Sequence, residues 1–578
     1  MIKLIKYLKP YIGHIFAIIV LLFSQAMCEL ALPDYMSKIV NQGISVGDTT
    51  YIIKTGGMML LISLGSAVCA IVVGLFASHI AAKVAMALRR DVFEKVESFS
   101  SVEFDKFQSA SLITRTTNDI TQVQTVLIMM LRMVFYAPIM GVGGIFKALS
   151  KNVSMSWIIA LAVIILIGII AVIFSLALPR FKRVQKLIDK LNLVTRENLS
   201  GMLVIRAFNT QGFEEARFDE TNKTLTGVNL FVNRLMSFLM PAMMLIMNLT
   251  TVLIVWIGAK EVGNLNMQVG DMMAFIQYAM QIIMSFLMIS MMFIMIPRAS
   301  VSGDRVAEVL ETEVAIRDPK EEKKFNNKVE GIVEFKNVEF SYPGAEDAVL
   351  HDISFTAKPG ETTAFIGSTG SGKSTLINLI PRFYDVTKGA ITIDGIDVRD
   401  ISQHNLHEQI GYVPQKAVLF SGDIESNLKY GRKEATDLEI EEVIEIAQSK
   451  EFILAKPEGI KAPIAQGGSN VSGGQKQRLS IGRALAKKAP ICILDDSFSA
   501  LDFKTDAALR KALKEKMADT TMLVVAQRIS SIMHAEQIIV LDGGRIVGKG
   551  THHELLQNCS VYKEIALSQL SREELDNE

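Results

Sequence analysis

A glycine-rich segment in the C-terminal half of this 578-residue chain has the composition of a phosphate-binding loop. It reads Gly367-Ser-Thr-Gly-Ser-Gly-Lys-Ser-Thr375 and follows an apolar run, 364–366, that predicts a strand. Glycines let successive backbone N–H groups turn toward phosphates, and the N-terminus of the next helix adds partial positive charge. Lys373 is then expected to bridge the β- and γ-phosphates, and Ser374 to ligate Mg²⁺. The residues expected to form this nucleotide site are Gly367, Ser368, Thr369, Gly370, Ser371, Gly372, Lys373, Ser374 and Thr375.

A second chemical group follows about a hundred residues later, where the apolar run Ile491-Cys-Ile-Leu494 predicts a buried strand that ends in Asp495. Its carboxylate is expected to hold Mg²⁺ through water. Such a pattern is weak by itself, because any strand of a parallel sheet can end in aspartate. Downstream of a phosphate-binding loop it predicts the metal side of a nucleotide site, formed by Ser374 and Asp495.

The N-terminal half predicts the elements that a membrane protein needs. Runs of about 20 apolar residues, the length that crosses a bilayer, occur six times. The weakest run contains Arg132, which we expect at its cytoplasmic end. The predicted spans are residues 11–32, 57–82, 126–146, 157–178, 235–259 and 272–296.

Charge sets the predicted orientation of these spans. Lysines and arginines concentrate before the first span and in segments 83–125 and 179–234, whereas the other connections are short and poor in them. The excess of positive charge on cytoplasmic loops then places both termini in the cytoplasm. The two basic segments have helical periodicity and predict helical extensions of the spans, with flexible basic loops as the alternative.

Composition predicts the domain boundaries of the chain and disfavours one class of partner, nucleic acid. We expect a membrane domain over 1–310, a charged linker over 311–330 and a soluble α/β domain over 331–578. The net charge is zero, and no basic face argues for nucleic acid. The four cysteines have neither metal-ligand nor disulfide spacing. A soluble ATPase that acts on nucleic acid is therefore disfavoured.

Over essentially its whole length the chain resembles the ABC transporter superfamily, specifically the bacterial type IV exporters that fuse one membrane domain to one nucleotide-binding domain. The resemblance implies six transmembrane helices with long cytoplasmic extensions, followed by an α/β P-loop ABC ATPase domain. It implies that Tyr342 stacks on adenine and that Gln415 senses the γ-phosphate and ligates Mg²⁺. It also implies that a signature sequence contacts the ATP of the opposite subunit and that a D-loop lies at the dimer interface. The matching residues are Ser472, Gly473, Gly474 and Gln475 for the signature, and Ser499 to Asp502 for the D-loop.

The same resemblance extends to the membrane half. Leu112-Ile-Thr-Arg-Thr-Thr-Asn-Asp119 and residues 197–208 are similar to the two intracellular-loop motifs of these exporters. In the family such segments carry the coupling helices that dock on the nucleotide-binding domains.

Departures from the family pattern fall on one ATP site. Asp496 stands where the family has a catalytic glutamate, and Gln527 where it has the switch histidine. A carboxylate that is one methylene shorter reaches roughly 1.5 Å less far toward the attacking water. An amide can hydrogen-bond a phosphate but cannot carry positive charge. The segment before the signature, Gln466-Gly-Gly-Ser-Asn470, also replaces a more usual acidic stretch. The residues expected to act on ATP are Asp496, Gln527, Lys373 and Gln415.

The intact signature sequence indicates which kind of dimer the chain forms. In the head-to-tail dimers of this family each ATP site combines one chain's P-loop with the other's signature. This chain would bring a weak P-loop side to one site and a sound signature to the other, which suits a heterodimer; in a homodimer both sites would be impaired. The expected cofactors are ATP and Mg²⁺, and the expected activity is ATP-driven export across a bacterial cytoplasmic membrane. Uptake and a nucleotide-gated sensor or channel remain alternatives.

The sixth predicted span indicates which class of substrate the protein transports. Its methionines recur at steps of three and four residues, on one helix face, together with Gln277 and Gln281. Methionine suits surfaces that accept several apolar shapes, so this stripe would line a cavity for amphiphilic, drug-like or lipid-like molecules. The alternative is ordinary packing against helices or lipid. Glu29, a carboxylate within a span, is either a substrate or proton contact or a group at the outer interface. The methionines of the stripe are Met273, Met280, Met284, Met288, Met291 and Met295.

Overall fold

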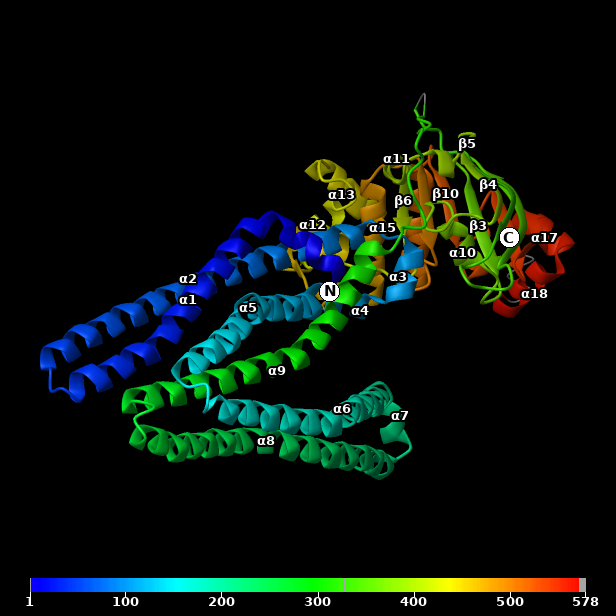
Figure 1. Cartoon of the computed structure of the whole chain (residues 1–578). Coiled ribbons are helices and arrows are strands. Elements are labelled where there is room, and N and C mark those ends of the chain that lie inside the picture. Colours follow the sequence, from blue (N-terminus) through cyan, green and yellow to red (C-terminus); the bar gives the residue numbers. More distant parts are fainter. Residues whose placement is uncertain (1, 326–327, 571–578) are drawn as a thin grey trace. The chain divides into compact units, whose positions relative to one another are not determined.

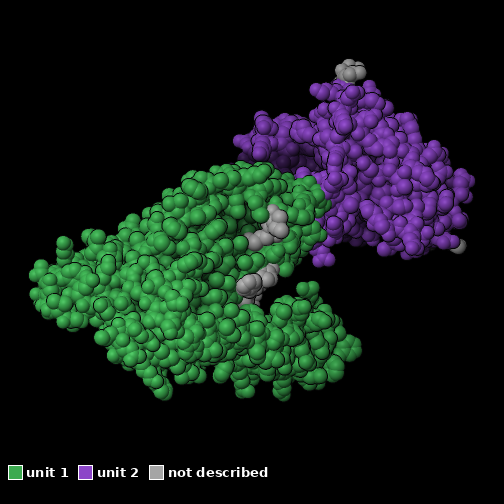
Figure 2. Space-filling view, in the orientation of Figure 1, with its two compact units in different colours: residues 1–97, 109–312 green, residues 98–108, 313–578 purple. Residues whose placement is uncertain are grey.

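The computed structural model describes residues 2–325 and 328–570, and the chain forms two compact units (Figures 1 and 2). Unit 1 comprises Met1–Glu97 and Ser109–Thr312, and unit 2 comprises Ser98–Gln108 and Glu313–Glu578. A short segment from the N-terminal half is therefore part of the second unit.

Unit 1 contains six helices that are long and apolar enough to cross a membrane, as the sequence predicted. Five of the six predicted spans fall within one of these helices, and the first, 11–32, begins one residue before its helix. Five of the six helices contain a proline and are not ended by it, because neighbouring helices and local adjustments can satisfy the backbone groups that a proline frees. The helices are α1 (Ile12–Lys38), α2 (Thr49–Glu97), α5 (Ile120–Lys151), α6 (Ser156–Ser200), α8 (Gln211–Gly263) and α9 (Val269–Glu311).

The helices extend well beyond the hydrophobic thickness of a bilayer. α8 has 53 residues, which at about 1.5 Å per residue gives roughly 80 Å, against a hydrocarbon core of about 30 Å. The predicted basic segments are thus helical extensions, and the flexible-loop alternative is wrong. Short helices connect the long ones: η2 (Ile39–Ile44), α4 (Ser109–Thr114), η3 (Arg115–Asp119) and α7 (Met202–Ala207), preceded by η1 (Ile2–Tyr11).

Packing within unit 1 pairs the helices closely. α5 lies against α9, α6 against α8 and α1 against α2, and Figure 1 shows α6 and α8 side by side with α7 joining them. The first half of α9 contributes the core, with Phe275, Tyr278 and Ile282 fully buried. The Tyr278 hydroxyl donates to the carbonyl oxygen of Leu30 at 3.0 Å, so the one polar atom of this ring is satisfied.

Unit 2 is built on two larger sheets and one small one. The strand order of the six-stranded sheet is β12-β11-β3-β10-β9-β6, and all of its neighbours pair in parallel except β11 with β12. Its central strands are buried on both faces, which explains their continuous apolar sequences. The strands are β3 (Thr362–Gly367), β6 (Ile410–Val413), β9 (Ile491–Asp495), β10 (Thr521–Val525), β11 (Gln537–Asp542) and β12 (Arg545–Gly550).

The second sheet is antiparallel, with strand order β2-β1-β4-β5. Its apolar face and one face of the parallel sheet share a core that includes Phe335, Phe355 and Phe365. Its strands are β1 (Val333–Phe340), β2 (Leu350–Ala357), β4 (Lys388–Ile393) and β5 (Ile396–Asp397), and a separate pair is formed by β7 (Gly422–Asp423) and β8 (Pro463–Ile464). The fold class predicted from the sequence, a helical membrane domain followed by an α/β P-loop domain, is confirmed.

Helices cover both faces of the parallel sheet. The opposite core, between that sheet and the helices, contains Leu428, Leu479, Leu494 and Leu509. The helices and single turns are α10 (Lys373–Asn378), η4 (Val398–Asp400), α11 (Gln403–Glu408), α12 (Ile424–Lys429), α13 (Asp437–Ile446), α14 (Lys450–Leu454), η5 (Gly459–Lys461), η6 (Gln466–Gly468), α15 (Gly473–Ala486), α16 (Phe503–Lys516), η7 (Ile529–Ser531), α17 (His552–Asn558) and α18 (Ser560–Gln569).

The helix α3 (Ser101–Phe107) belongs to unit 2 although it lies between helices of unit 1 in the sequence. Its buried Glu103 closes a capping box with Ser100 and accepts a hydrogen bond from the backbone N–H of Ala315 at 3.0 Å. Asp105 accepts a hydrogen bond from the Tyr384 hydroxyl at 2.9 Å, and burial raises the pKa of Tyr384 to about 12. These contacts attach the turn after α2 to the nucleotide unit.

Candidate nucleotide site and membrane cavity

The predicted nucleotide residues meet because the strands before them are parallel neighbours. β3 leads into the glycine loop, β9 into Asp495 and Asp496, β10 toward Gln527, and β6 toward Gln415. Since β3, β10, β9 and β6 are adjacent and parallel, their carboxyl ends lie at one edge of the sheet. A cavity of about 250 Å³ lies there, lined by Val349, Thr369, Gly370, Gly372, Lys373, Ser374, Thr375, Gln415, Asp495, Asp496, Val525 and Gln527.

The glycine loop forms the phosphate side of this cavity. Gly372 has φ 95°, a backbone conformation that favours glycine, and a Cβ added there would lie 2.7 Å from the Leu350 side chain. The Lys373 ammonium donates to the carbonyl oxygens of Gly367 and Ser368 at 2.9 and 2.7 Å. Burial lowers the pKa of Lys373, which the two aspartates oppose. A buried lysine ammonium held by the loop is suited to phosphate oxygens.

Ser374 and Asp495 form the candidate metal pair. The Ser374 hydroxyl donates to Asp495 Oδ1 at 3.1 Å, and burial raises the pKa of the Asp495 carboxyl. A hydroxyl and a carboxylate oxygen this close are the hard ligands that Mg²⁺ prefers, and a cation would offset the desolvation of the acid. The residues present thus fit Mg²⁺. Gln415, the third expected ligand, lines the same cavity.

Asp496 is held by the amides of the two predicted glutamines. Its Oδ2 accepts a hydrogen bond from Gln527 Nε2 at 2.8 Å and a longer one from Gln415 Nε2 at 3.4 Å. Burial raises its pKa. The backbone at Asp496 is left-handed, with φ 46°, a conformation that aspartate adopts more readily than most residues. Asp496 Oδ2, the oxygen that contacts Gln527, therefore accepts hydrogen bonds from neutral side chains.

Tyr342 lies beside the glycine loop but does not line the cavity. Its hydroxyl is 2.9 Å from the Thr375 hydroxyl, and its ring meets those of Phe340 and Tyr384 edge-on, with centroids 4.9 and 5.3 Å apart. The ring is partly buried against the β-sheet core. Its stacking on adenine stays a prediction.

The structure does not bring the signature residues to the glycine loop of the same chain. Ser472 is the N-cap of α15, accepts a hydrogen bond from the backbone N–H of Gln475 at 3.3 Å and is exposed. Asp502 caps α16 in the same way, accepting from the backbone N–H of Thr505 at 2.9 Å. Neither group lines the nucleotide cavity. The N-terminus of this 14-residue helix is exposed and carries the partial positive charge of a helix N-terminus.

Val349 and Val525 line the nucleotide cavity and were missed by the sequence reasoning. Val525 is the last residue of β10, so its position follows from the parallel pairing of β10 with β9. Val349 precedes β2, and its N–H donates to the carbonyl oxygen of Phe340 at 2.7 Å. No motif marks Val349, because only the pairing of the antiparallel sheet brings it here.

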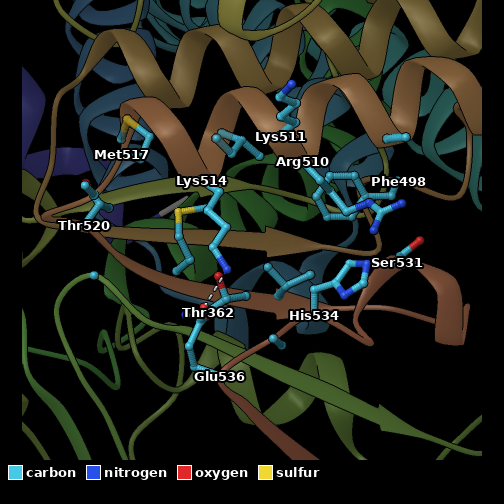
Figure 3. A pocket seen from close by; sticks show the side chains of 17 residues that line it. Thr362, Phe498, Arg510, Lys511, Lys514, Met517, Thr520, Ser531, His534 and Glu536 are labelled. Carbon is cyan, nitrogen blue, oxygen red and sulfur yellow. Dashed lines mark hydrogen bonds and ion pairs between the residues drawn. The ribbon is translucent and has the colours of Figure 1, made fainter. Parts of the chain in front are cut away.

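A separate cavity of about 500 Å³ lies in unit 2 between α16, β10 and the segment around His534 (Figure 3). Lys514 and Glu536, labelled in the figure, both line it and form an ion pair of 3.0 Å. Its lining combines apolar side chains such as Phe498 and Met517 with charged ones such as Arg510. None of the residues predicted to bind ATP lines it.

Unit 1 has a cavity of about 690 Å³ between α1, α2, α5 and α9. Three methionines of the predicted stripe, Met288, Met291 and Met295, line it. Gln277 and Gln281 do not line it; the Gln281 amide donates to the carbonyl oxygen of Glu29 at 3.3 Å. The other stripe methionines, Met273, Met280 and Met284, are likewise outside this lining. The prediction that the whole stripe lines a cavity therefore holds only for its C-terminal part.

Six membrane-spanning helices followed by a parallel-sheet domain with a P-loop define a membrane-embedded, nucleotide-driven protein. The family model described as ABC transporter transmembrane region matches residues 15–286, and the one described as ABC transporter matches residues 350–499. The chain is 40% identical to an uncharacterized ABC transporter ATP-binding protein of Mycobacterium tuberculosis, over 98% of this chain and 97% of that protein. It belongs to the ABC transporter family and is a transport ATPase that binds ATP.

Two further comparisons concern the exporter branch. An ATP-dependent lipid A-core flippase of Haemophilus ducreyi is 29% identical over 98% of each chain. The structure of a bacterial Atm1-family ABC exporter with ATP bound superposes with a TM-score of 0.80 at 24% identity, covering 98% of this chain and 99% of that one. The fold is thus that of a type IV ABC exporter.

Proposed function

We propose that this chain is one half of a heterodimeric ABC exporter and contributes the P-loop side of a degenerate ATP site. Its substrates are amphiphilic molecules, drug-like or lipid-like, and ATP with Mg²⁺ drives their export across a bacterial cytoplasmic membrane with both termini in the cytoplasm. Residues 1–310 act as the membrane domain, 311–330 as the linker and 331–578 as the nucleotide-binding domain.

The observation that carries this proposal is the hydrogen bond from Gln527 to Asp496, 2.8 Å long. A general base needs a free lone pair within hydrogen-bond distance of the water that attacks the γ-phosphate. Asp496 is one methylene shorter than glutamate, and its Oδ2 is shared by two amide donors. The site is therefore built to hold ATP and to hydrolyse it slowly.

The other site residues take the roles that the family resemblance implies. The glycine loop and Lys373 bind the β- and γ-phosphates, Ser374 and Asp495 hold Mg²⁺ with Gln415, and Tyr342 stacks on adenine. Mg²⁺, when bound, would neutralise charge on the phosphate oxygens. Gln527 positions the γ-phosphate as a neutral donor.

A partner subunit is supported by two surfaces. The signature helix α15 presents an exposed N-terminus to an anion that this chain does not supply. The short helix α7 has no buried residue, and around it Leu203, Val204 and Phe208 are 84%, 59% and 75% exposed. Apolar side chains gathered on a segment predicted to lie in the cytoplasm mark a protein interaction site. A second half-transporter would cover them with its nucleotide-binding domain.

The amphiphilic substrate is supported by the methionine-lined cavity in unit 1 and by the flippase relative, whose name gives lipid A as its cargo. A cavity of about 690 Å³ is within the range that holds one small ligand.

The proposal is tested by purifying the tagged chain from its native cells and identifying the co-purified subunit. We expect a second ABC half-transporter that carries glutamate and histidine at the positions of Asp496 and Gln527. The reconstituted pair should move a fluorescent amphiphile in an ATP-dependent manner, and accumulation on the opposite side of the membrane would mean uptake. Recovery of a homodimer alone with full ATPase activity would contradict the proposal.

A further inference from the structure

The cavity of unit 1 combines a soft apolar wall with one cation. Seven methionines line it, from α5 and from α9. Methionine is flexible and polarizable, so such a wall adapts to an alkyl chain or a ring without a fixed shape. The methionines are Met129, Met130, Met133, Met288, Met291, Met292 and Met295.

Arg132 is the only charged side chain among the described residues that line this cavity. It lies on α5 within the predicted span 126–146, one turn before Tyr136, which also lines the cavity. No described side chain forms an ion pair or a hydrogen bond with its guanidinium. An arginine inside an apolar span is costly unless an anion or water satisfies it, also near the cytoplasmic end where we expect Arg132, and ionisable residues within spans commonly mark functional sites.

Glu29, the carboxylate within the first predicted span, is hydrogen-bonded to other side chains. Its carboxylate accepts hydrogen bonds from Gln25 at 3.0 Å, from Ser66 at 3.1 Å and from the Tyr136 hydroxyl. Three neutral donors satisfy it without Arg132. Gln25 and Tyr136 stand between this carboxylate and the cavity, because both line the cavity and both donate to Glu29.

We propose that Arg132 binds the anionic headgroup of an amphiphile whose apolar body packs on the methionines, so that the exporter selects negatively charged over positively charged amphiphiles. This inference rests on the proposed export function and names its substrate class. A guanidinium presents a fork of N–H donors that matches phosphate, sulfonate or carboxylate oxygens. The described wall holds no acid that would favour a cation instead.

The test uses the full-length chain in nanodiscs of phosphatidylcholine, a neutral lipid. Dodecyl phosphate and dodecyltrimethylammonium carry the same alkyl chain with opposite charge, and inorganic phosphate carries the headgroup charge without the chain. Ligand-induced thermal stabilisation is titrated for the wild type, Arg132→Gln and Arg132→Lys. Lys182→Gln, which removes an exposed cation of α6 that does not line the cavity, is the matched control.

We expect dodecyl phosphate to stabilise the wild type at lower concentration than the ammonium analogue. Arg132→Gln should weaken the binding of dodecyl phosphate by about tenfold or more, since one charge-assisted contact is lost. Arg132→Lys should retain most of the binding, and Lys182→Gln all of it. Equal binding of the two amphiphiles, or an unchanged Arg132→Gln titration, would overturn the inference, as would inorganic phosphate binding as well as dodecyl phosphate.

Two further arms locate the source of the ligand and separate the two proposals. Phosphatidylglycerol added to the nanodiscs should compete through Arg132 if bilayer lipid is the substrate, and should leave the titration unchanged if a separate amphiphile is. In the reconstituted pair, dodecyl phosphate should stimulate ATP hydrolysis. Stimulation by the cationic amphiphile alone would contradict the inference about Arg132 but not the proposed export function. No stimulation by any amphiphile would contradict the proposed export function itself.

Discussion

Restoring the two altered side chains of the ATP site should restore hydrolysis. In the double variant Asp496→Glu, Gln527→His the carboxylate gains roughly 1.5 Å of reach, about one carbon–carbon bond. The amide that donates to Asp496 Oδ2 at 2.8 Å is replaced by an imidazole that can carry charge. A general base misplaced by about 1 Å can cost about a hundredfold in rate, or about 2.7 kcal/mol of barrier. We therefore expect turnover to rise about a hundredfold.

The assay exploits the intact signature sequence. When the purified chain pairs with itself, both composite sites carry its own P-loop and its own sound signature, so no partner is needed. Phosphate release is measured at saturating Mg-ATP in nanodiscs for the wild type, the double variant and each single variant. Lys373→Ala, which removes the phosphate-binding ammonium, is the background control. The reasoning is refuted if the double variant binds ATP as tightly as the wild type and still hydrolyses it no faster.

Three other outcomes follow from the structure. Asp495→Asn should raise the melting temperature of the nucleotide-free protein at pH 7, because burial raises the pKa of Asp495 and its charged form lowers stability once the pH exceeds that pKa. In the same thermal-melting assay, the Mg²⁺-dependent stabilisation by ATP should disappear. Leu203→Asp on α7 together with Phe208→Asp directly after it, both exposed, should change the free energy of unfolding by no more than about 0.5 kcal/mol but uncouple substrate from ATPase stimulation in the assembled pair. Unchanged coupling would show that this surface has no partner. Leu494→Ala, in a fully buried strand, should lower the free energy of unfolding by about 3 kcal/mol in a denaturation experiment, and a loss below about 1 kcal/mol would contradict the packing described.

The sequence was most informative where chemistry depends on the order of parallel strands. Asp495, Asp496 and Gln527 follow buried apolar strands, so their meeting at one sheet edge could be expected from strand and loop patterns together with the family resemblance. The six membrane helices were equally legible, because apolar length alone decides them. The exact ends of the helices could not be predicted, since the helices continue beyond the apolar runs into amphipathic segments that have no sharp stop signal.

Contacts between distant segments were beyond the reach of sequence patterns. The α3 helix contacts the rest of unit 2 through Glu103 and Asp105. No pattern in its seven residues predicts that their partners are the backbone of Ala315 and the hydroxyl of Tyr384. The methionine stripe was misjudged for a related reason. A helical period places its side chains on one face of α9, but the first half of that face packs close to α1, where Gln281 donates to the backbone of Glu29. Periodicity finds a face and cannot tell a packed face from an open one.

The balance between ATP binding and ATP turnover in the unmodified chain tests the central claim most directly. The purified chain, without any partner, is loaded with Mg-ATP in nanodiscs, and bound nucleotide and released phosphate are measured on the same sample. We predict that ATP binds and remains intact for far longer than in the assembled pair, with turnover about a hundredfold slower. Turnover by this chain alone at the rate of the pair would contradict the account.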